Sequence, residues 1–311
     1  MSDNKLEFVV EDFIMKSFGM DDDEDEIETS DISMWIREKD TFRTSGDVST
    51  QKQLDPGMYT VHVNRDYGIF CRKIDIKSDE LFIFNNSQVK PLIKEIDLFW
   101  NKAEVYKRNR LIHKRGILLE GLPGTGKSSI ISLLASDLIK AGGVVFKVNG
   151  AKNLADYIEF VCYSLRKIQP KVPIITIIED MDQYDDVEDL LLDFLDGKYN
   201  LDHHVVIGTT NNTQALPPTY LRPSRIDLRV VVGRPNEQTR REFLKHKNVP
   251  EDVIETLISK TGKFTLADLK ELYICIYVLD YSIEDALKKL AVKKEKKNYL
   301  DESPDSSEIG I

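Results

Sequence analysis

The sequence predicts an α/β fold with a parallel sheet, preceded by a small β-rich N-terminal domain and followed by a mostly helical segment. Strand patterns alternate with helix patterns from about residue 116 to 212, which is typical of βαβ units. The strand over residues 174–178 consists of isoleucines apart from Thr176, as expected for a sheet covered on both faces. A glycine-rich loop joins the first of these strands to a helix, so this core carries a candidate ligand site.

The loop over residues 121–128, GLPGTGKS, fits the pattern G-x-x-x-x-G-K-[ST]. It follows an apolar strand and opens an apolar helix, so backbone N–H groups and the helix N-terminus can bind phosphates. Lys127 can reach the β- and γ-phosphates, and the Ser128 hydroxyl can hold Mg²⁺. The sequence therefore predicts that ATP with Mg²⁺ binds at Gly121, Pro123, Gly124, Thr125, Gly126, Lys127, Ser128 and Ser129.

Carboxylates follow the apolar strand 174–178 directly, in the order Glu179, Asp180, Met181, Asp182. Ligands of a doubly wound sheet bind beyond the carboxyl ends of its strands, so these acids are expected to face the nucleotide. We assign Glu179 to the Mg²⁺ shell, together with Ser128, and Asp180 to polarisation of the attacking water. For Asp182, a catalytic role and a capping role both remain open.

Polar residues also follow the next apolar strand, which ends in GTTNN. The amide of Asn211 could orient water between the γ-phosphate and the acids. Arg222 and Arg225, on either side of Pro223, suit presentation of guanidinium groups to phosphate. Alone, such arginines would be surface ion-pair partners; their place after the other three motifs favours a catalytic role.

The segments GILLEGLPGTGKSS, IITIIEDMD, LLLDFLDG, VVIGTTNN and LRPSRID, in this order and spacing, resemble an AAA+ ATPase over residues 91–290. The pattern is similar to the AAA subfamily of the mitochondrial inner-membrane translocase that helps assemble the respiratory bc1 complex, whose members also carry Glu-Asp after the second strand motif. The resemblance implies ATP hydrolysis, a parallel sheet of order 5-1-4-3-2, a helical lid and a ring, by default a hexamer, with a heptamer left open. It also implies that Asn211 is sensor 1 and that Arg222 and Arg225 act on the neighbouring subunit's nucleotide.

The chain departs from that family in three places. No membrane helix stands ahead of the core, and residues 1–90 match no segment of the family. The region NGAKNLADYIEF lacks the aromatic-hydrophobic-glycine pore loop of protein-threading rings, and Tyr157 is the aromatic residue within reach. The lid stretch FTLADL resembles the family's F-S-G-A-D-L but is followed by no sensor-2 arginine, although Lys263 and Lys270 are nearby.

Charge and composition suggest five segments: an acidic, mostly disordered 1–31, the β-rich domain 32–90, the nucleotide-binding domain 91–234, the lid 235–292 and a flexible tail 293–311. The formal net charge of the chain is −10, and residues 1–31 account for all of it. The balanced remainder argues against a nucleic-acid partner without excluding one. Three dispersed cysteines, and the lack of a signal-like or membrane-spanning stretch, predict a cytoplasmic protein without a membrane partner.

Three functions remain open on the sequence. The first is an ATP-driven homo-oligomeric ring that remodels or translocates an unknown protein partner. The second is a nucleotide-switched assembly or scaffold factor with slow hydrolysis, favoured by the Glu-Asp order and the missing pore aromatic. The third is a DNA-directed motor, for which the basic stretch 107–115 is the candidate contact.

Overall fold

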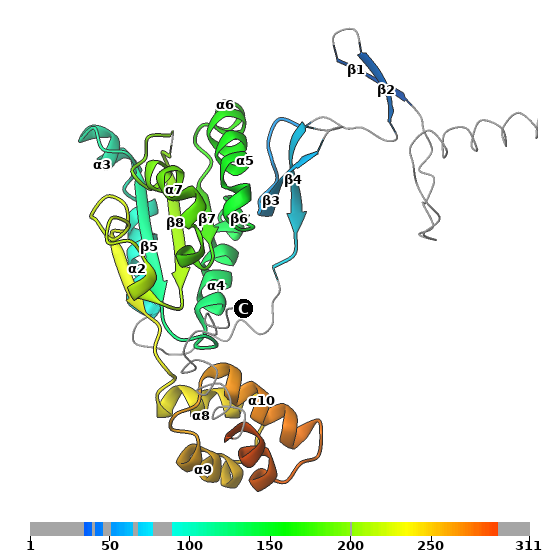
Figure 1. Cartoon of the computed structure of the whole chain (residues 1–311), viewed down its shortest axis with the longest axis vertical. Coiled ribbons are helices and arrows are strands. Elements are labelled where there is room, and N and C mark those ends of the chain that lie inside the picture. Colours follow the sequence, from blue (N-terminus) through cyan, green and yellow to red (C-terminus); the bar gives the residue numbers. More distant parts are fainter. Residues whose placement is uncertain are drawn as a thin grey trace, which may run out of the picture. The chain divides into compact units, whose positions relative to one another are not determined.

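The computed structural model describes residues 34–38, 41–45, 51–64, 68–76, 89–199 and 201–291 (Figure 1). The acidic segment 1–31 and the tail 293–311 lie outside the described residues. The chain divides into two compact units, Met1–Lys52 and Gln53–Ile311. In the first unit, β1 (Met34–Glu38) pairs with β2 (Thr41–Ser45) as an antiparallel ladder.

A seven-stranded sheet of order β4-β3-β6-β7-β8-β5-β9 forms the centre of the second unit. Five parallel strands carry the predicted fold: β5 (Lys114–Glu120), β6 (Val144–Val148), β7 (Ile174–Ile178), β8 (His204–Thr210) and β9 (Leu228–Val231). Counted from the strand before the glycine-rich loop, their order is 5-1-4-3-2, as predicted.

The sheet is larger than the sequence predicted, because β3 (Gly57–Asn64) and β4 (Gly68–Ile74) extend it beyond β6. β3 runs parallel to β6 and antiparallel to β4. The strands expected within 32–90 therefore do not all form a separate domain, and the division between units falls near residue 52. The physical reason is burial: residues 57–61 of β3 are buried on successive positions, so this half of the strand needs a neighbour and cover on both faces.

Helices cover the two faces of the sheet, and each face has its own apolar core. On one face lie α2 (Val89–Trp100) and α4 (Lys127–Lys140), packed on side chains such as Ile117, Leu119 and Ile177. On the other lie α5 (Leu154–Ile158), a π-helix (Glu159–Leu165), α6 (Arg166–Ile168) and α7 (Glu188–Leu195). Neighbouring residues of a strand, for instance Leu118 and Leu119, contribute to opposite cores, as the two-residue period of a strand requires. Short elements complete the unit: α3 (Ala103–Arg108) and the 3₁₀ turns Ala151–Asn153, Met181–Gln183, Asp185–Val187 and Thr213–Ala215.

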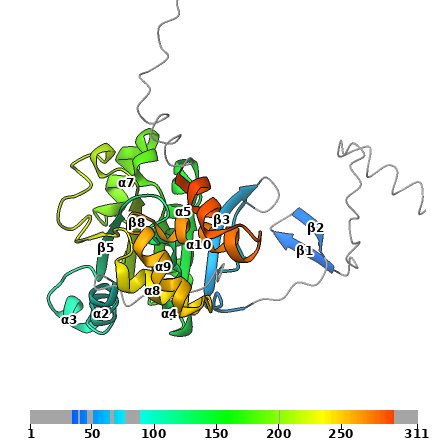
Figure 2. The same cartoon turned by 90° about the horizontal axis from the view of Figure 1, so that it is seen from below.

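The helices of the predicted lid pack around a third apolar core of their own (Figures 1 and 2). They include α8 (Glu237–His246), α9 (Glu251–Lys260) and α10 (Leu266–Tyr277). Its core contains Phe243, Ile254, Leu269 and Leu272. Thr265 caps α10, accepting a hydrogen bond from the Asp268 amide while the Asp268 carboxylate accepts one from the Thr265 amide. This capping box places the start of α10 next to the glycine-rich loop.

Candidate nucleotide-binding site

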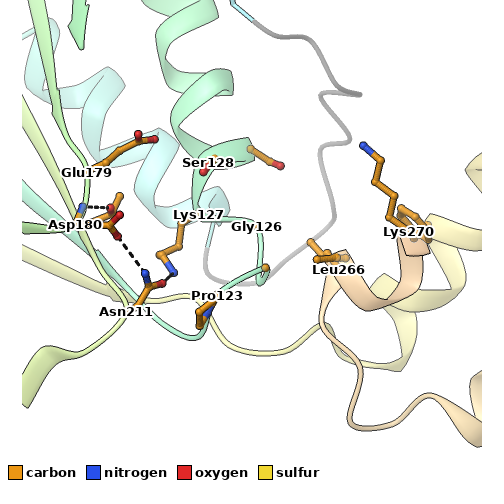
Figure 3. Close-up of a pocket in the computed structure, with 14 residues that line it drawn as sticks. Pro123, Gly126, Lys127, Ser128, Glu179, Asp180, Asn211, Leu266 and Lys270 are labelled. Atoms are coloured by element: carbon orange, nitrogen blue, oxygen red, sulfur yellow. Dashed lines mark hydrogen bonds between the residues drawn. The ribbon is translucent and has the colours of Figure 1, made fainter. Parts of the chain in front are cut away.

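A pocket of about 500 Å³ lies where the carboxyl ends of β7 and β8, the glycine-rich loop after β5 and the lid meet (Figure 3). It is lined by Pro123, Gly124, Gly126, Lys127, Ser128, Ser129, Glu179, Asp180, Thr209, Asn211, Phe243, Leu266, Ala267 and Lys270. Most of the loop residues predicted from sequence are therefore brought together with both predicted acids and the predicted amide. Four lining residues were not predicted from the sequence: Thr209, Phe243, Leu266 and Ala267.

Two predicted loop residues support the pocket instead of lining it. Gly121 lies against Val232, just after β9, where a Cβ atom would be 2.3 Å from the Val232 carbonyl oxygen. Thr125 is buried, and its hydroxyl donates to the Leu122 carbonyl at 2.9 Å. These contacts fix the curvature of the loop.

The loop adopts a backbone that glycine alone accommodates without strain. Gly124 has φ +78° and Gly126 has φ +107°. A Cβ atom on Gly124 would also lie 2.7 Å from the Ala267 Cβ of the lid. The lid is bonded to the loop here, since the Ala267 amide donates to the Gly124 carbonyl at 3.1 Å. The pocket therefore has two walls, one from the sheet and one from the lid, that touch at a glycine.

Lys127 is the buried cation of the site, with an exposed fraction of 8%. Its ammonium group donates to the Gly121 carbonyl at 2.6 Å, to the Leu122 carbonyl at 3.2 Å and to Asn211 Oδ1 at 2.7 Å. Burial lowers the pKa of this lysine below its usual value, although the carboxylates of Asp180 and Asp182 oppose the shift. A buried ammonium is thus held at the N-terminus of α4, where an anionic ligand would be bound most strongly.

Asp180 and Asn211 lie next to each other at the ends of neighbouring strands. The Asn211 amide donates to Asp180 Oδ1 at 3.0 Å, and the Asp180 amide donates to Thr209 Oγ1 at 3.0 Å (Figure 3). Asp180 has φ +49°, a left-handed conformation that aspartate tolerates better than most residues. Asn211 therefore links the buried ammonium group of Lys127 to the carboxylate assigned to water activation.

Glu179 points to a different side of the pocket from Asp180, near Ser128 (Figure 3). Its carboxylate pairs with Lys147 of β6, with Nζ 2.5 Å from Oε2. Mg²⁺ prefers one or two protein oxygens together with phosphate and water oxygens. Since the Ser128 hydroxyl and the Glu179 carboxylate line the same pocket, the donor set fits the predicted Mg²⁺ site.

Asp182, whose role the sequence left open, has a structural contact. Thr210 Oγ1 donates to Asp182 Oδ1 at 2.6 Å, and Asp182 does not line the pocket. A second linkage that the sequence did not indicate involves Glu120, at the end of β5. Thr213 donates to its carboxylate at 2.5 Å, and Arg229 pairs with it at 3.0 Å. Burial raises the pKa of Glu120, but these two partners outweigh it and hold the pKa below the usual value.

The two predicted arginines differ from each other. Arg222 is exposed, whereas the Arg225 guanidinium is bonded to Asp196 at the end of α7. Both lie outside the pocket of their own chain. Their action on a neighbouring subunit's nucleotide therefore stays a prediction.

Comparison with known proteins shows which protein family the nucleotide-binding region resembles. Residues 117–234 match the model of the ATPase family associated with various cellular activities (AAA). An AAA ATPase forming ring-shaped complexes from Corynebacterium diphtheriae is 28% identical over 229 residues, covering 64% of this chain and 45% of that protein. The ATP-dependent zinc metalloprotease FtsH 2 of Sphaerobacter thermophilus is 30% identical over 204 residues, covering 58% of this chain and 31% of that protein. A proteasome-associated ATPase from Frankia casuarinae is 27% identical over 197 residues, covering 53% and 33%.

The chain spans less than half the length of these relatives. The matched segment begins within β5 and ends just after β9, so it contains the second half of β5, the other four parallel strands and the motifs that line the pocket from the sheet side. Together, the sheet order, the phosphate-binding loop and the family match show that this chain carries an AAA ATPase domain.

Proposed function

We propose that the protein binds ATP with Mg²⁺ in this pocket and hydrolyses it to ADP and phosphate. The observation that carries the proposal is the linkage of Lys127 to Asn211 and of Asn211 to Asp180 along one wall of the pocket, with Glu179 on the other side. Side chains of this kind can bind phosphates, orient a water molecule and accept its proton.

Each group has one task in this mechanism. The N–H groups of the loop and the ammonium of Lys127 bind the phosphates and stabilise the negative charge that builds up on the transferring group. Asp180 accepts the proton of the attacking water, and Asn211 orients that water next to it. Ser128 and Glu179 would hold Mg²⁺, which when bound neutralises phosphate charge.

The experiment that tests this proposal compares the parent protein with Lys127→Ala. We expect the parent to bind a fluorescent ATP analogue and release phosphate from ATP, and the variant to lose both activities. The variant lacks the one lysine among the described residues that reaches the loop carbonyls from within the pocket. Phosphate release by the variant at the parent rate would overturn the assignment.

We propose further that the protein works as a homo-oligomeric ring, a hexamer by family default, with a heptamer as the other outcome. Two relatives with ring-forming names support this, as does Arg222, which is exposed and outside its own pocket. The Glu179-Asp180 order supports a nearer kinship with the bc1-assembly subfamily. None of the helices in the described part of the chain has the length and hydrophobicity that a bilayer span requires.

The task proposed for that ring is remodelling or translocation of a protein partner. One observation favours a second candidate instead, a nucleotide-switched assembly factor. After the turn at 149–150, residues 151–168 run from β6 towards β7 as consecutive helical segments, without an intervening loop. Tyr157 has an exposed fraction of 1% and bonds Thr176 in the core, so it cannot grip a substrate. A protein partner would then be bound on an outer surface.

The basic stretch 107–115 does not form one free cationic surface for DNA. Lys114 donates to the carbonyls of Leu195 and Ser224, and Arg115 pairs with Glu95. The ATPase rate measured alone, with DNA and with fractionated host protein separates the three functions. We expect stimulation by a protein fraction and none by DNA; a rate that no fraction changes would favour the switch, and stimulation by DNA would favour the motor.

A further inference from the structure

We propose that Lys147 sets the magnesium requirement of the nucleotide site by compensating the charge of Glu179. The inference rests on the proposed function, because it assumes that Glu179 belongs to the Mg²⁺ shell. Lys147 lies outside the pocket and acts through Glu179, by positioning this carboxylate and compensating its charge.

Lys147 lies near the carboxyl end of β6, in the sequence VVFKV, whose four other residues are all buried. β6 pairs with β7 in parallel register, with Lys147 opposite Ile177 and Val148 opposite Ile178. The Lys147 side chain therefore reaches the first residue after β7 from the neighbouring strand, and that residue is Glu179.

The ion pair between Lys147 and Glu179 is short and partly shielded from water. The Nζ–Oε2 distance is 2.5 Å, and the exposed fractions of the two side chains are 33% and 35%. Both groups are thus about two-thirds shielded from water, and their attraction is stronger than that of a fully exposed pair. Lys147 thus partly neutralises the carboxylate that would otherwise interact with a divalent cation alone.

The positive charge of Lys147 would weaken the binding of a metal ion to Glu179. Lys147 pairs with Oε2 of Glu179, so a metal that binds either carboxylate oxygen meets a positive charge a few ångströms away. This charge weakens Mg²⁺ binding whichever oxygen the metal takes. With Lys147 in place, the Glu179 carboxylate would hold Mg²⁺ well only when nucleotide phosphates add their own negative charge.

Lys147→Met tests this directly on the full chain, since it removes the charge and keeps most of the side-chain volume. The measured quantity is the dissociation rate of a fluorescent ADP analogue at a series of free Mg²⁺ concentrations. We expect the Mg²⁺ concentration at the midpoint of retention to fall by roughly tenfold, equivalent to about 1.4 kcal/mol. Lys147→Arg, which keeps the charge, should behave as the parent does.

Lys140→Met is the matched control, because Lys140 is an exposed cation at the end of α4 with a single long ion pair to Asp137. It should leave the midpoint unchanged. Lys147→Gln is measured in parallel, so that an unstable methionine variant does not decide the outcome. In the Glu179→Gln background, Lys147→Met should have a much smaller effect, because the paired charge is already gone.

An unchanged or higher midpoint in Lys147→Met and Lys147→Gln would overturn the inference, and a higher one would mean that the pair only orients Glu179. Failure of the proposed function has a different signature. In that case the parent itself would not bind the fluorescent nucleotide, or its dissociation would not respond to Mg²⁺ at all.

Discussion

Arg225 and Asp196 form a bidentate ion pair, in which Nε and Nη2 of the guanidinium donate to the two carboxylate oxygens at 2.5 and 2.6 Å. The remaining terminal nitrogen, Nη1, donates to the Thr219 carbonyl at 2.8 Å. The hydrogen bonds from Arg225 hold the pKa of Asp196 below its usual range. Arg225 thus ties the segment after Asn211 to the end of α7, while Arg222 of the same segment is exposed.

This difference leads to opposite expectations for the two arginines. Arg222→Ala should keep nucleotide binding and thermal stability but lose hydrolysis, by a factor on the order of 10³ to 10⁵ if it acts as a finger. Arg225→Ala should instead destabilise the fold by about 1–2 kcal/mol, because it leaves Asp196 without its partner. Phosphate release and thermal unfolding of both variants check the split; a stable, inactive Arg225→Ala beside a fully active Arg222→Ala would reverse it.

A mixing experiment tests whether Arg222 acts between subunits. An Arg222→Ala subunit keeps an intact phosphate loop, and a Lys127→Ala subunit keeps an intact Arg222. Neither should hydrolyse ATP alone, but mixed assemblies should regain activity at interfaces that combine the two intact halves. Co-assembly is verified by pull-down of differently tagged subunits, and a mixture that co-assembles yet stays inactive counts against a shared site.

The two acids after β7 should also separate by function. Asp180→Asn should bind nucleotide and fail to hydrolyse it, because its amide cannot accept the proton of water. Glu179→Gln should raise the Mg²⁺ concentration needed for nucleotide retention. Single-turnover phosphate release and Mg²⁺ titration distinguish the variants; a fast Asp180→Asn together with an inactive Glu179→Gln would mean that the roles are exchanged.

Gly124→Ala should loosen the contact between the lid and the phosphate loop. The added Cβ would lie 2.7 Å from the Ala267 Cβ, on a backbone with φ +78° that alanine rarely adopts. We expect weaker nucleotide binding, by roughly tenfold or more, with smaller changes in overall stability. Gly142→Ala is the control, since Gly142 also has positive φ (+89°) but no atom within 4 Å of the added carbon. Equal losses of nucleotide affinity in both variants would attribute the effect to backbone strain alone.

Stability should decrease in mild acid because of a buried histidine. Burial lowers the pKa of His204 well below its usual value, and the positive charges of Arg166 and Lys114 lower it further. The unfolded chain therefore takes up a proton near pH 6.5 that the folded chain refuses. The stabilising contribution is complete above about pH 6.5 and is lost as the pH falls below it, by up to about 1.4 kcal/mol per pH unit.

His204→Gln checks this origin, since it keeps a hydrogen-bonding group beside Thr176, to which His204 is bonded at 2.6 Å. Denaturant unfolding at pH 7.5, 6.5 and 5.5 should show a smaller loss of stability in the variant than in the parent. Parallel curves for the two proteins would place the acid sensitivity elsewhere, for example in His113, whose pKa burial also lowers.

Much of the site could be predicted without coordinates, because a parallel sheet brings the carboxyl ends of its strands to one edge. Glu179, Asp180 and Asn211 stand just after such ends, Lys127 opens the helix that follows the loop after β5, and all four line one pocket. Lys147 could not be predicted in this way. It belongs to a strand that the sequence marks only as apolar, and its partner is determined by the register of β6 on β7.

The sequence by itself determined the glycine-rich loop and most of the side chains that line the pocket, and its resemblance to a family implied the order of the five parallel strands. The loop and the lining residues follow from local patterns: strand periodicity, glycine spacing and polar residues at strand ends. Only the tertiary structure decided that β3 and β4 extend the sheet, that Tyr157 is a core residue, that Arg225 is bonded to Asp196, and that Lys147 pairs with Glu179. Each of these depends on which residues from distant parts of the chain become neighbours, and burial and strand register, not local sequence, determine those neighbours.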